Sequence, residues 1–145
     1  MLAISSGGGH WVQLLRLRDA FVGCDVTYVT VDDAYRSDVP GCRFRTVTDG
    51  TRWNKARLLR MAVQIAWILL RVRPDVVIST GAAPGYFAIR LGRLLWARTI
   101  WVDSVANVEK LSLSGQRVGP HADLWLTQWP HLARPDGPHF MGGVL

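Results

Sequence analysis

The residues best suited to chemistry follow the first apolar stretch of the chain, where residues 6–10 read Ser-Gly-Gly-Gly-His. Residues 2–5 have the pattern of a short strand, and a helical pattern begins at Trp11. A strand, a glycine-rich turn and a helix in this order direct backbone N–H groups and the helix N-terminus at an anion, usually a phosphate. Glycine allows that approach because it has no side chain. His10 would lie at the mouth of this site, where it could transfer a proton.

The glycine loop departs from the two common nucleotide-binding patterns. A P-loop requires a Lys-Ser or Lys-Thr pair after its glycines, and this chain has none there. The dinucleotide pattern G-x-G-x-x-G could begin at Gly7, but Val12 stands at its third glycine. The acidic pair Asp32 and Asp33 follows the second predicted strand and could hold a ribose, so a stand-alone nicotinamide- or nucleotide-binding enzyme is one alternative. The glycines could also form no more than a tight turn.

Composition limits the class of protein. At 145 residues, the chain is long enough for one domain with a substantial core. Its two cysteines, Cys24 and Cys42, form no C-x-x-C motif, which suits a reducing compartment and gives no zinc site. The four histidines lack metal-ligand spacing, so we expect neither a metal nor a cofactor. No basic region precedes the first strand, so we expect no signal peptide.

Positive charge is concentrated in one segment of the chain. Residues 52–98 contain nine lysines and arginines and one acid, Asp75, for a net charge of +8, whereas the rest of the chain carries −2. The same segment holds the most apolar helical pattern, at residues 53–72, and the chain has seven tryptophans, a residue that favours membrane interfaces. A basic, apolar helix is more typical of membrane-surface binding than of nucleic-acid binding. Its uncharged run, residues 61–70, is too short to span a bilayer.

Strand and helix patterns alternate along the chain. Strands are predicted at residues 2–5, 25–31, 42–47, 75–79, 99–102, 122–127 and 139–141, and helices at 9–22, 53–72 and 86–96, the last after a turn at 81–85. This alternation predicts an α/β fold with a Rossmann-like, doubly wound parallel sheet. Ligands of such sheets bind at the carboxyl ends of the strands. That edge would gather the loops at 5–10, 79–85, 103–107 and 127–130.

The long helix at 53–72 separates on a helical wheel into a basic stripe and an apolar face. We expect the apolar face to pack on the sheet; it consists of Leu59, Ala62, Ala66, Leu69 and Leu70. Tryptophans and arginines of this helix and the next would form an edge that contacts lipid. The predicted membrane contacts are Trp53, Arg57, Arg60, Trp67, Arg90, Arg93 and Trp96.

Several later motifs, taken with the glycine loop, resemble one family. They are Ser-Thr-Gly-Ala-Ala-Pro-Gly at 79–85, Trp-Val-Asp-Ser-Val-Ala-Asn-Val at 101–108, Leu-Ser-Leu-Ser-Gly at 111–115 and Ala-Asp-Leu-Trp-Leu-Thr-Gln-Trp-Pro at 122–130. In this order they resemble the acceptor-side, membrane-associated subunit of the two-part UDP-N-acetylglucosamine transferase that extends lipid-linked sugars. Similar subunits are encoded in bacterial exopolysaccharide operons. The resemblance covers nearly the whole chain.

The resemblance implies the N-terminal half of a GT-B glycosyltransferase, with residues 1–145 forming one Rossmann-like acceptor-binding domain. A separate partner chain would supply the donor-binding C-terminal half and bind the UDP-sugar, so this chain would be inactive alone. It would hold a polyprenyl-diphosphate-linked sugar acceptor on the cytoplasmic face of a membrane, as a peripheral protein, and N-acetylglucosamine would be the sugar transferred. The apolar tail at 139–145 would be a place for the partner to dock.

The chain departs from the family's pattern in three places. It begins at its first strand, where the family often has a transmembrane anchor, so membrane contact would depend on its helices or on the partner. Asp103 stands where Glu is common, which keeps the acid but shortens its reach. Asn107 stands where Arg is common, which removes a cation that could clamp a phosphate.

An inverting, metal-independent transferase needs a base, groups that stabilise the leaving nucleoside diphosphate, and positioning of both substrates. His10 is the leading candidate base, although it could instead only bind a phosphate or a loop carbonyl. Asp103 is the second candidate, as a base or as an orienting residue.

The candidate substrate- and diphosphate-binding residues are Ser6, Gly7, Gly8, Gly9, Gly81, Pro84, Gly85, Ser104, Ser112 and Ser114. Two of them, Ser112 and Ser114, could instead cap a helical turn. A module that only recruits a partner to the membrane, with no catalytic role, is a further alternative for the whole chain.

Overall fold

The computed structural model describes residues 1–50 and 53–144, and within them seven strands form one sheet. The strands are β1 (Leu2–Ile4), β2 (Thr27–Thr30), β3 (Arg43–Thr46), β4 (Val76–Ser79), β5 (Arg98–Val102), β6 (Leu124–Thr127) and β7 (His139–Phe140). Their order across the sheet is β3-β2-β1-β4-β5-β6-β7, and all neighbours run parallel. The carboxyl ends of the strands therefore lie along one edge, which we call the carboxyl edge.

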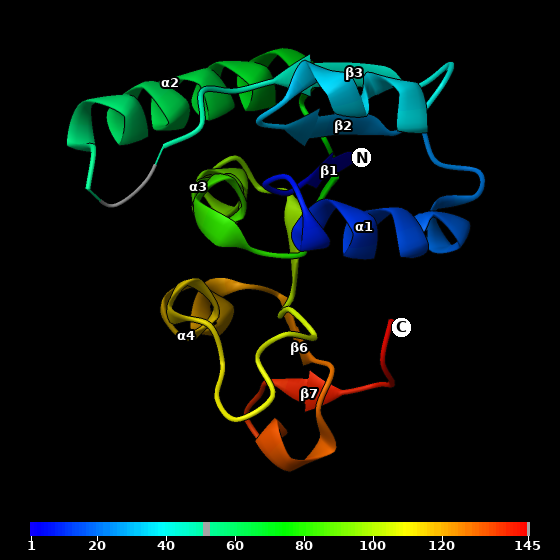
Figure 1. Cartoon of the computed structure of the whole chain (residues 1–145), viewed down its shortest axis with the longest axis vertical. Coiled ribbons are helices and arrows are strands. Elements are labelled where there is room, and N and C mark those ends of the chain that lie inside the picture. The colour runs from blue at the N-terminus through cyan, green and yellow to red at the C-terminus, as the bar shows by residue number, and fades with distance from the viewer. Residues whose placement is uncertain (51–52, 145) are drawn as a thin grey trace.

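Helices cover both faces of this sheet. In the described part of the chain the α-helices are α1 (Gly9–Arg16), α2 (Lys55–Val72), α3 (Ala82–Leu94) and α4 (Leu113–Val118). Figure 1 shows α2, α3 and α4 on one side of the sheet and α1 on the other. From β1, the chain first builds β2 and β3 to one side and then returns to build β4 to β7 on the other. The predicted Rossmann-like, doubly wound fold is confirmed.

Each face of the sheet has its own apolar core, because strands covered on both faces bury nearly every side chain. On the α2 and α3 side, Ile4 of β1 packs with Ile65 and Ile89 of the two helices. On the α1 side, Trp11 is buried, and its ring lies edge-on to Phe44 of β3 at a centroid distance of 6.1 Å. These two cores fix the starts of α1 and α3 against the carboxyl edge.

The predicted strands and the long helix are confirmed to within two residues at each end, but two helix boundaries are wrong. The first helix ends at Arg16 rather than at residue 22, and a 3-10 helix, Arg18–Phe21, follows it. The helix predicted from residue 86 begins at Ala82, so the turn predicted at 81–85 is shortened to Gly81 and Ala82, which have positive φ angles of 138° and 63°. Pro84 is the third residue of α3, where a missing N–H removes no intrahelical hydrogen bond.

The face of α2 that packs on the sheet is not the one predicted from the wheel. Met61, Ile65, Ile68 and Leu69 are buried, so of the predicted face only Leu69 lies in the core. Leu59 and Leu70 were also expected to pack there, but their side chains are 67% and 57% exposed, while the two alanines of that face are half-buried.

An exposed apolar stripe runs along α2 and consists of Leu59, Val63, Trp67 and Leu70; we call it the α2 stripe. At about 100° per residue, it lies roughly half a turn around the helix axis from the buried side chains. The helix is apolar on most sides except for its basic stripe, so its periodicity alone does not say which side meets the sheet. Among the described residues, no helix is both long and apolar enough to cross a membrane.

Candidate functional site

The glycine loop joins β1 to α1 at the carboxyl edge, as predicted. Gly8 adopts a left-handed φ of 64°, and its carbonyl accepts the first hydrogen bond of α1, from the Val12 N–H at 3.1 Å. Within the described residues, the N–H groups of Gly9 and His10 have no acceptor, as is usual for the first turn of a helix. These two donors and the positive end of the helix dipole therefore remain for an anion.

Tyr35, which the sequence did not single out, covers part of the glycine loop. Its hydroxyl oxygen accepts a hydrogen bond from the Gly8 N–H at 2.9 Å, so that amide is already used within the chain. A Cβ on Gly7 would come within 3.0 Å of the Tyr35 ring, which explains a glycine at that position. The Tyr35 ring also packs against the Trp11 ring, at a centroid distance of 5.4 Å and an angle of 37° between the ring planes, which holds it over the loop.

His10 is held in one orientation by the loop that follows β4. Its Nδ1 lies 2.9 Å from the Thr80 carbonyl oxygen, and the Thr80 hydroxyl donates to the His10 carbonyl at 2.7 Å. Because a carbonyl oxygen only accepts, Nδ1 carries the proton, and Nε2 is left as the basic nitrogen of the neutral ring. A Cβ on Gly81 would lie 2.6 Å from the His10 ring, so glycine makes room for this arrangement. The structure thus brings the predicted His10 and Gly81 together.

Asp103 lies deeper than the predicted role of base requires. Its side chain is 1% exposed, and four donors converge on its carboxylate. Oδ1 accepts from the Ser104 N–H at 2.9 Å and from the Asn107 amide at 2.7 Å; Oδ2 accepts from the Ser112 N–H and hydroxyl, both at 3.2 Å. This geometry favours the alternative role of an orienting residue, which holds the loop after β5 against the start of α4.

Three of the remaining predicted site residues, Ser112, Pro84 and Gly85, have places in the structure of α3 and α4. The Ser112 hydroxyl oxygen accepts from the Gly115 N–H at 2.8 Å and so caps α4, as its alternative assignment stated. Pro84 and Gly85 are buried in the first turn of α3, and a Cβ on Gly85 would collide with the side chain of Ser79. Gly85 therefore serves close packing of α3 against β4. Ser6 and Ser114 are half-buried at their predicted places.

A buried polar cluster, formed by Gln13, Gln128, Asp103 and Ser104, connects four segments of the chain near the carboxyl edge. The Gln13 amide donates to the Ser104 hydroxyl at 3.0 Å, and its carbonyl oxygen accepts from the Gln128 amide at 2.7 Å. Gln128 also donates to the Asp103 carbonyl at 2.9 Å and accepts from the Val144 N–H at 2.8 Å. The segment predicted to dock the partner is thus tied to the site through Gln128; its last residue, Leu145, lies outside the described residues.

The predicted membrane contacts belong to α2, α3 and the residues next to these helices, which cover the same side of the sheet. All seven residues, Trp53, Arg57, Arg60, Trp67, Arg90, Arg93 and Trp96, are exposed. The guanidinium of Arg71 lies 4.9 Å above the Trp67 ring, so a cation flanks the α2 stripe directly. The α2 stripe adds apolar area to this face through Leu59 and Leu70, which were predicted to pack on the sheet but are exposed.

The acidic pair considered for a ribose has local partners. The Asp32 carboxylate accepts from the Ala34 N–H at 2.9 Å, and Asp33 forms an ion pair with Arg36 at 2.7 Å. These contacts start and brace the 3-10 helix Asp33–Asp38. Across the described ranges, no group of three or more His, Cys, Asp or Glu residues is arranged to hold a metal ion.

The parallel sheet with its polar carboxyl edge defines a class of protein, which is one Rossmann-like half of a GT-B fold. The crystal structure of MurG from Acinetobacter baumannii superposes on 98% of this chain with a TM-score of 0.77 at 12% sequence identity. The match covers 45% of the MurG chain, so this chain spans less than half of that protein. At this identity the likeness concerns the fold alone.

The family follows from the sequence comparison. Residues 36–143 match the family described as "Oligosaccharide biosynthesis protein Alg14 like", and the chain belongs to this family. UDP-N-acetylglucosamine transferase subunit ALG14 of Eremothecium gossypii is 29% identical in an alignment 159 residues long, gaps included. The alignment covers 88% of this chain and 71% of that subunit. The subunit of the same name from Rattus norvegicus is 24% identical in an alignment 166 residues long, which covers 91% of this chain and 76% of that subunit. The resemblance found in the motifs is confirmed.

Proposed function

We propose that this chain is the acceptor-binding, membrane-associated subunit of a two-chain glycosyltransferase, and that residues 1–145 act as one acceptor-binding domain. A partner chain binds a UDP-sugar, with N-acetylglucosamine as the sugar, and transfer occurs to a polyprenyl-diphosphate-linked sugar. Family membership supports the coarser statement, that the chain is a glycosyltransferase subunit. The single observation that carries the finer statement is His10, fixed by Thr80 beside free helix N-terminal amides at the carboxyl edge.

In the proposed reaction, Nε2 of His10 accepts the proton of the acceptor hydroxyl. The hydroxyl oxygen then forms a bond with the anomeric carbon of the donor sugar, while the bond from that carbon to the UDP oxygen breaks. UDP leaves with the electron pair, and the configuration inverts. The hydrogen bond from Nδ1 to the Thr80 carbonyl stabilises the imidazolium that forms and keeps Nε2 directed at the substrate.

The amides of Gly9 and His10 are the groups we assign to a diphosphate at the carboxyl edge. They are unpaired within the described residues, and the α1 dipole adds partial positive charge there. Asp103, which lacks access to solvent, acts as a positioning residue, since its four hydrogen bonds fix the loop beside the site. Gly81 is assigned a spatial role, because only glycine leaves room for the His10 ring.

Membrane association is assigned to the face formed by α2 and α3. The α2 stripe exposes four apolar side chains in a row, and arginines flank it. Because α2 runs antiparallel to the strands, its N-terminal end lies at the carboxyl edge, so a membrane along the stripe would also reach the acceptor site. We propose a peripheral location on the cytoplasmic face of the membrane.

The test is an assay of the complex. The tagged chain would be purified with its partner from detergent-solubilised extract, and transfer measured from UDP-N-acetylglucosamine to polyprenyl-diphosphate-linked N-acetylglucosamine. We expect His10→Gln to lower kcat by about 10²-fold or more, since a positioned base contributes this much, while the complex stays intact. His131→Gln changes an exposed histidine whose ring nitrogen bonds the Val108 carbonyl and not the glycine loop; it serves as the matched control and should retain activity.

Two results would count against the proposal in different ways. Full activity of the His10→Gln complex would show that His10 is not the catalytic base, and would favour a chain that only recruits the partner to the membrane. An intact wild-type complex that transfers no sugar would contradict the proposal that these two chains together catalyse this transfer.

A further inference from the structure

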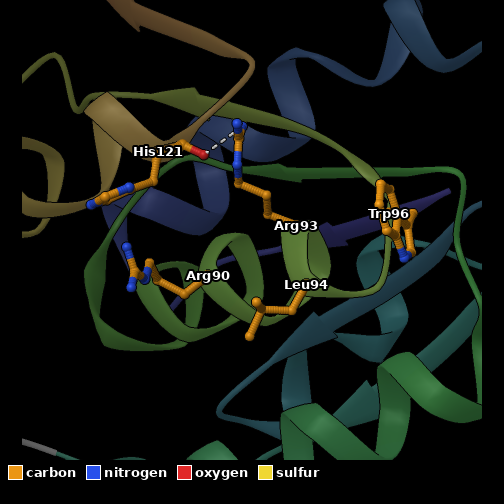
Figure 2. Close-up of a pocket in the computed structure, with 5 residues that line it drawn as sticks. All are labelled: Arg90, Arg93, Leu94, Trp96 and His121. Carbon is orange, nitrogen blue, oxygen red and sulfur yellow. Dashed lines mark hydrogen bonds between the residues drawn. The ribbon is translucent and has the colours of Figure 1, made fainter.

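A pocket lies at the edge of the sheet opposite the candidate site. It has a volume of about 440 Å³ and lies between the end of α3 and the segment before β6. Its lining residues are Arg90, Arg93, Leu94, Trp96 and His121. Figure 2 shows the Arg90 and Arg93 side chains pointing from α3 toward the segment that holds His121. Because α3 ends where β5 begins, this pocket is separate from the carboxyl edge and from His10.

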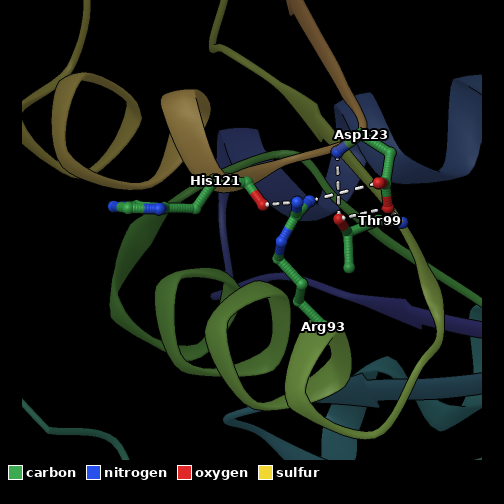
Figure 3. Close-up of polar contacts among 4 residues, drawn as sticks. All are labelled: Arg93, Thr99, His121 and Asp123. Atoms are coloured by element: carbon green, nitrogen blue, oxygen red, sulfur yellow. Dashed lines mark hydrogen bonds and ion pairs between the residues drawn. The ribbon is translucent and has the colours of Figure 1, made fainter.

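Arg93 is held in place, and its charge is partly balanced. Its guanidinium donates to the His121 carbonyl at 3.0 Å and to Asp123 Oδ1 at 3.1 Å, as Figure 3 shows. Burial acts to raise the pKa of Asp123, but hydrogen bonds from Thr99 and the charges of Arg93 and Arg98 outweigh it and lower the pKa. Asp123 is therefore an anion at neutral pH and fixes the Arg93 side chain at the pocket wall.

Arg90 supplies the unbalanced charge. Its side chain is exposed, and no acid pairs with it among the described residues. Arg98, at the start of β5, adds a second positive charge close to Asp123. With three arginines and one aspartate, the surroundings of the pocket carry a net positive charge and match an anion. An arginine binds phosphate oxygens more strongly than it binds neutral acceptors.

The rim of this pocket is apolar and exposed. The Trp96 side chain is 95% exposed, and Leu94 beside it is also exposed. Trp96 has a left-handed φ of 65°, which an L residue adopts at a cost. It also lines a second hollow, which it shares with Leu95 and with Leu70 of the α2 stripe. The apolar surface therefore continues from the α2 stripe to the rim of the basic pocket.

We propose that this pocket binds the phosphate head group of an anionic phospholipid. Arg90 and Arg93 would face the phosphate, while Leu94 and Trp96 enter the interface between head groups and acyl chains, where tryptophan is favoured. The inference rests on the membrane association proposed above and adds that the membrane surface must be anionic. An acidic protein segment would satisfy the arginines, but it would leave the exposed rim without an apolar partner.

The test compares vesicles of two compositions. The purified chain would be sedimented with vesicles of phosphatidylcholine alone, and with vesicles in which a third of the lipid is phosphatidylglycerol. We expect binding to the anionic vesicles to be about tenfold tighter or more. Arg90→Gln should weaken that binding about fivefold, the effect of one cation near an anionic surface, and leave binding to neutral vesicles unchanged.

A matched variant separates a local site from general charge. Arg18→Gln removes the same charge from an exposed arginine after α1, on the other side of the sheet, and should leave binding to both vesicles within about twofold of the wild type. Equal losses in Arg18→Gln and Arg90→Gln would overturn the head-group site. Equal wild-type binding to both vesicles would also overturn it, while the membrane association would stand. Binding to neither vesicle would remove both proposals.

Discussion

At the scale of single residues, Asp103 is the acid on which the candidate site depends most for its shape. We expect Asp103→Asn to lower the free energy of unfolding by about 1–3 kcal/mol, because an amide replaces one acceptor oxygen with a donor facing buried donors. Urea unfolding would measure this change. Asp136→Asn, at an exposed position, is the control and should leave stability unchanged. An unaltered midpoint in Asp103→Asn would mean that the carboxylate does not hold the loop.

The residues of the site divide into those that sequence could indicate and those it could not. His10 and Gly81 follow strands whose carboxyl ends had to meet, so a shared edge could be expected. The bond between the His10 ring and the Thr80 carbonyl could not, since it depends on a side-chain rotamer. Gln13 and Gln128 are 115 residues apart, and a glutamine inside a helical pattern gives no signal of a buried partner.

Tyr35 belongs to the same group of missed residues. It lies in a polar stretch between two strands, where the sequence suggested only a loop. Its position over Gly8 depends on the path of a 3-10 helix, and no periodic pattern in sequence specifies that path.

At the scale of elements, α2 shows why the positions of the strands were easier to predict than the orientation of a helix. Parallel strands between helices must be apolar on both faces, so apolar runs that alternate with helical patterns indicate where they lie. A helix that is apolar on most sides gives a poor estimate of which side is buried, and Leu59 and Leu70 were assigned to the wrong side for this reason. The error matters, because those two side chains contribute to the proposed membrane face.

The contact between α3 and the paired strands β5 and β6 gives a prediction that depends on pH. Asp123 joins Arg93 of α3 to the N–H of Thr99 in β5, and its pKa is lowered from the usual 3.8. A carboxyl group whose pKa is lower in the folded state stabilises the fold at any pH above its pKa in the unfolded chain. This contribution is lost as the pH falls through its pKa in the folded state. We therefore expect Asp123→Asn to lower the unfolding free energy by about 1 kcal/mol at pH 7.

The same variant should approach the wild type in stability as the pH drops below 3.8. Urea unfolding across the acid range would measure both chains. A difference that stays constant down to the lowest pH at which both chains fold would show that the charge of Asp123 makes no contribution.

At the scale of the whole molecule, the two edges of the sheet have different tasks in our proposals. The carboxyl edge holds His10 and the free amides of α1, and the opposite edge holds the basic pocket beside Trp96. The α2 stripe runs between them along one face. A membrane that contacts this whole face would therefore anchor the chain at one edge and deliver the acceptor at the other.

Trp96 allows stability and membrane binding to be separated in one variant. Its side chain is 95% exposed, so its removal leaves no cavity, and its backbone has a φ of 65°. Glycine at this position would remove about 1–2 kcal/mol of backbone strain, because it adopts a left-handed φ without a steric clash. It would also cost about 0.5–1 kcal/mol of stability, because glycine has more conformational freedom in the unfolded chain. We expect Trp96→Gly to unfold at an equal or slightly higher urea concentration than the wild type while it binds vesicles several-fold more weakly. A clear loss of stability would show that Trp96 serves the fold.

The left-handed tryptophan thus has a consequence for protein engineering. Position 96 holds a bulky residue in a conformation that glycine would adopt more easily, so Trp96→Gly should be among the substitutions that a screen for stability selects. A trade-off between stability and function is expected where an exposed side chain contacts something outside the molecule. Engineering this chain for thermal tolerance would tend to remove Trp96 early, and with it the membrane attachment that we propose for this surface.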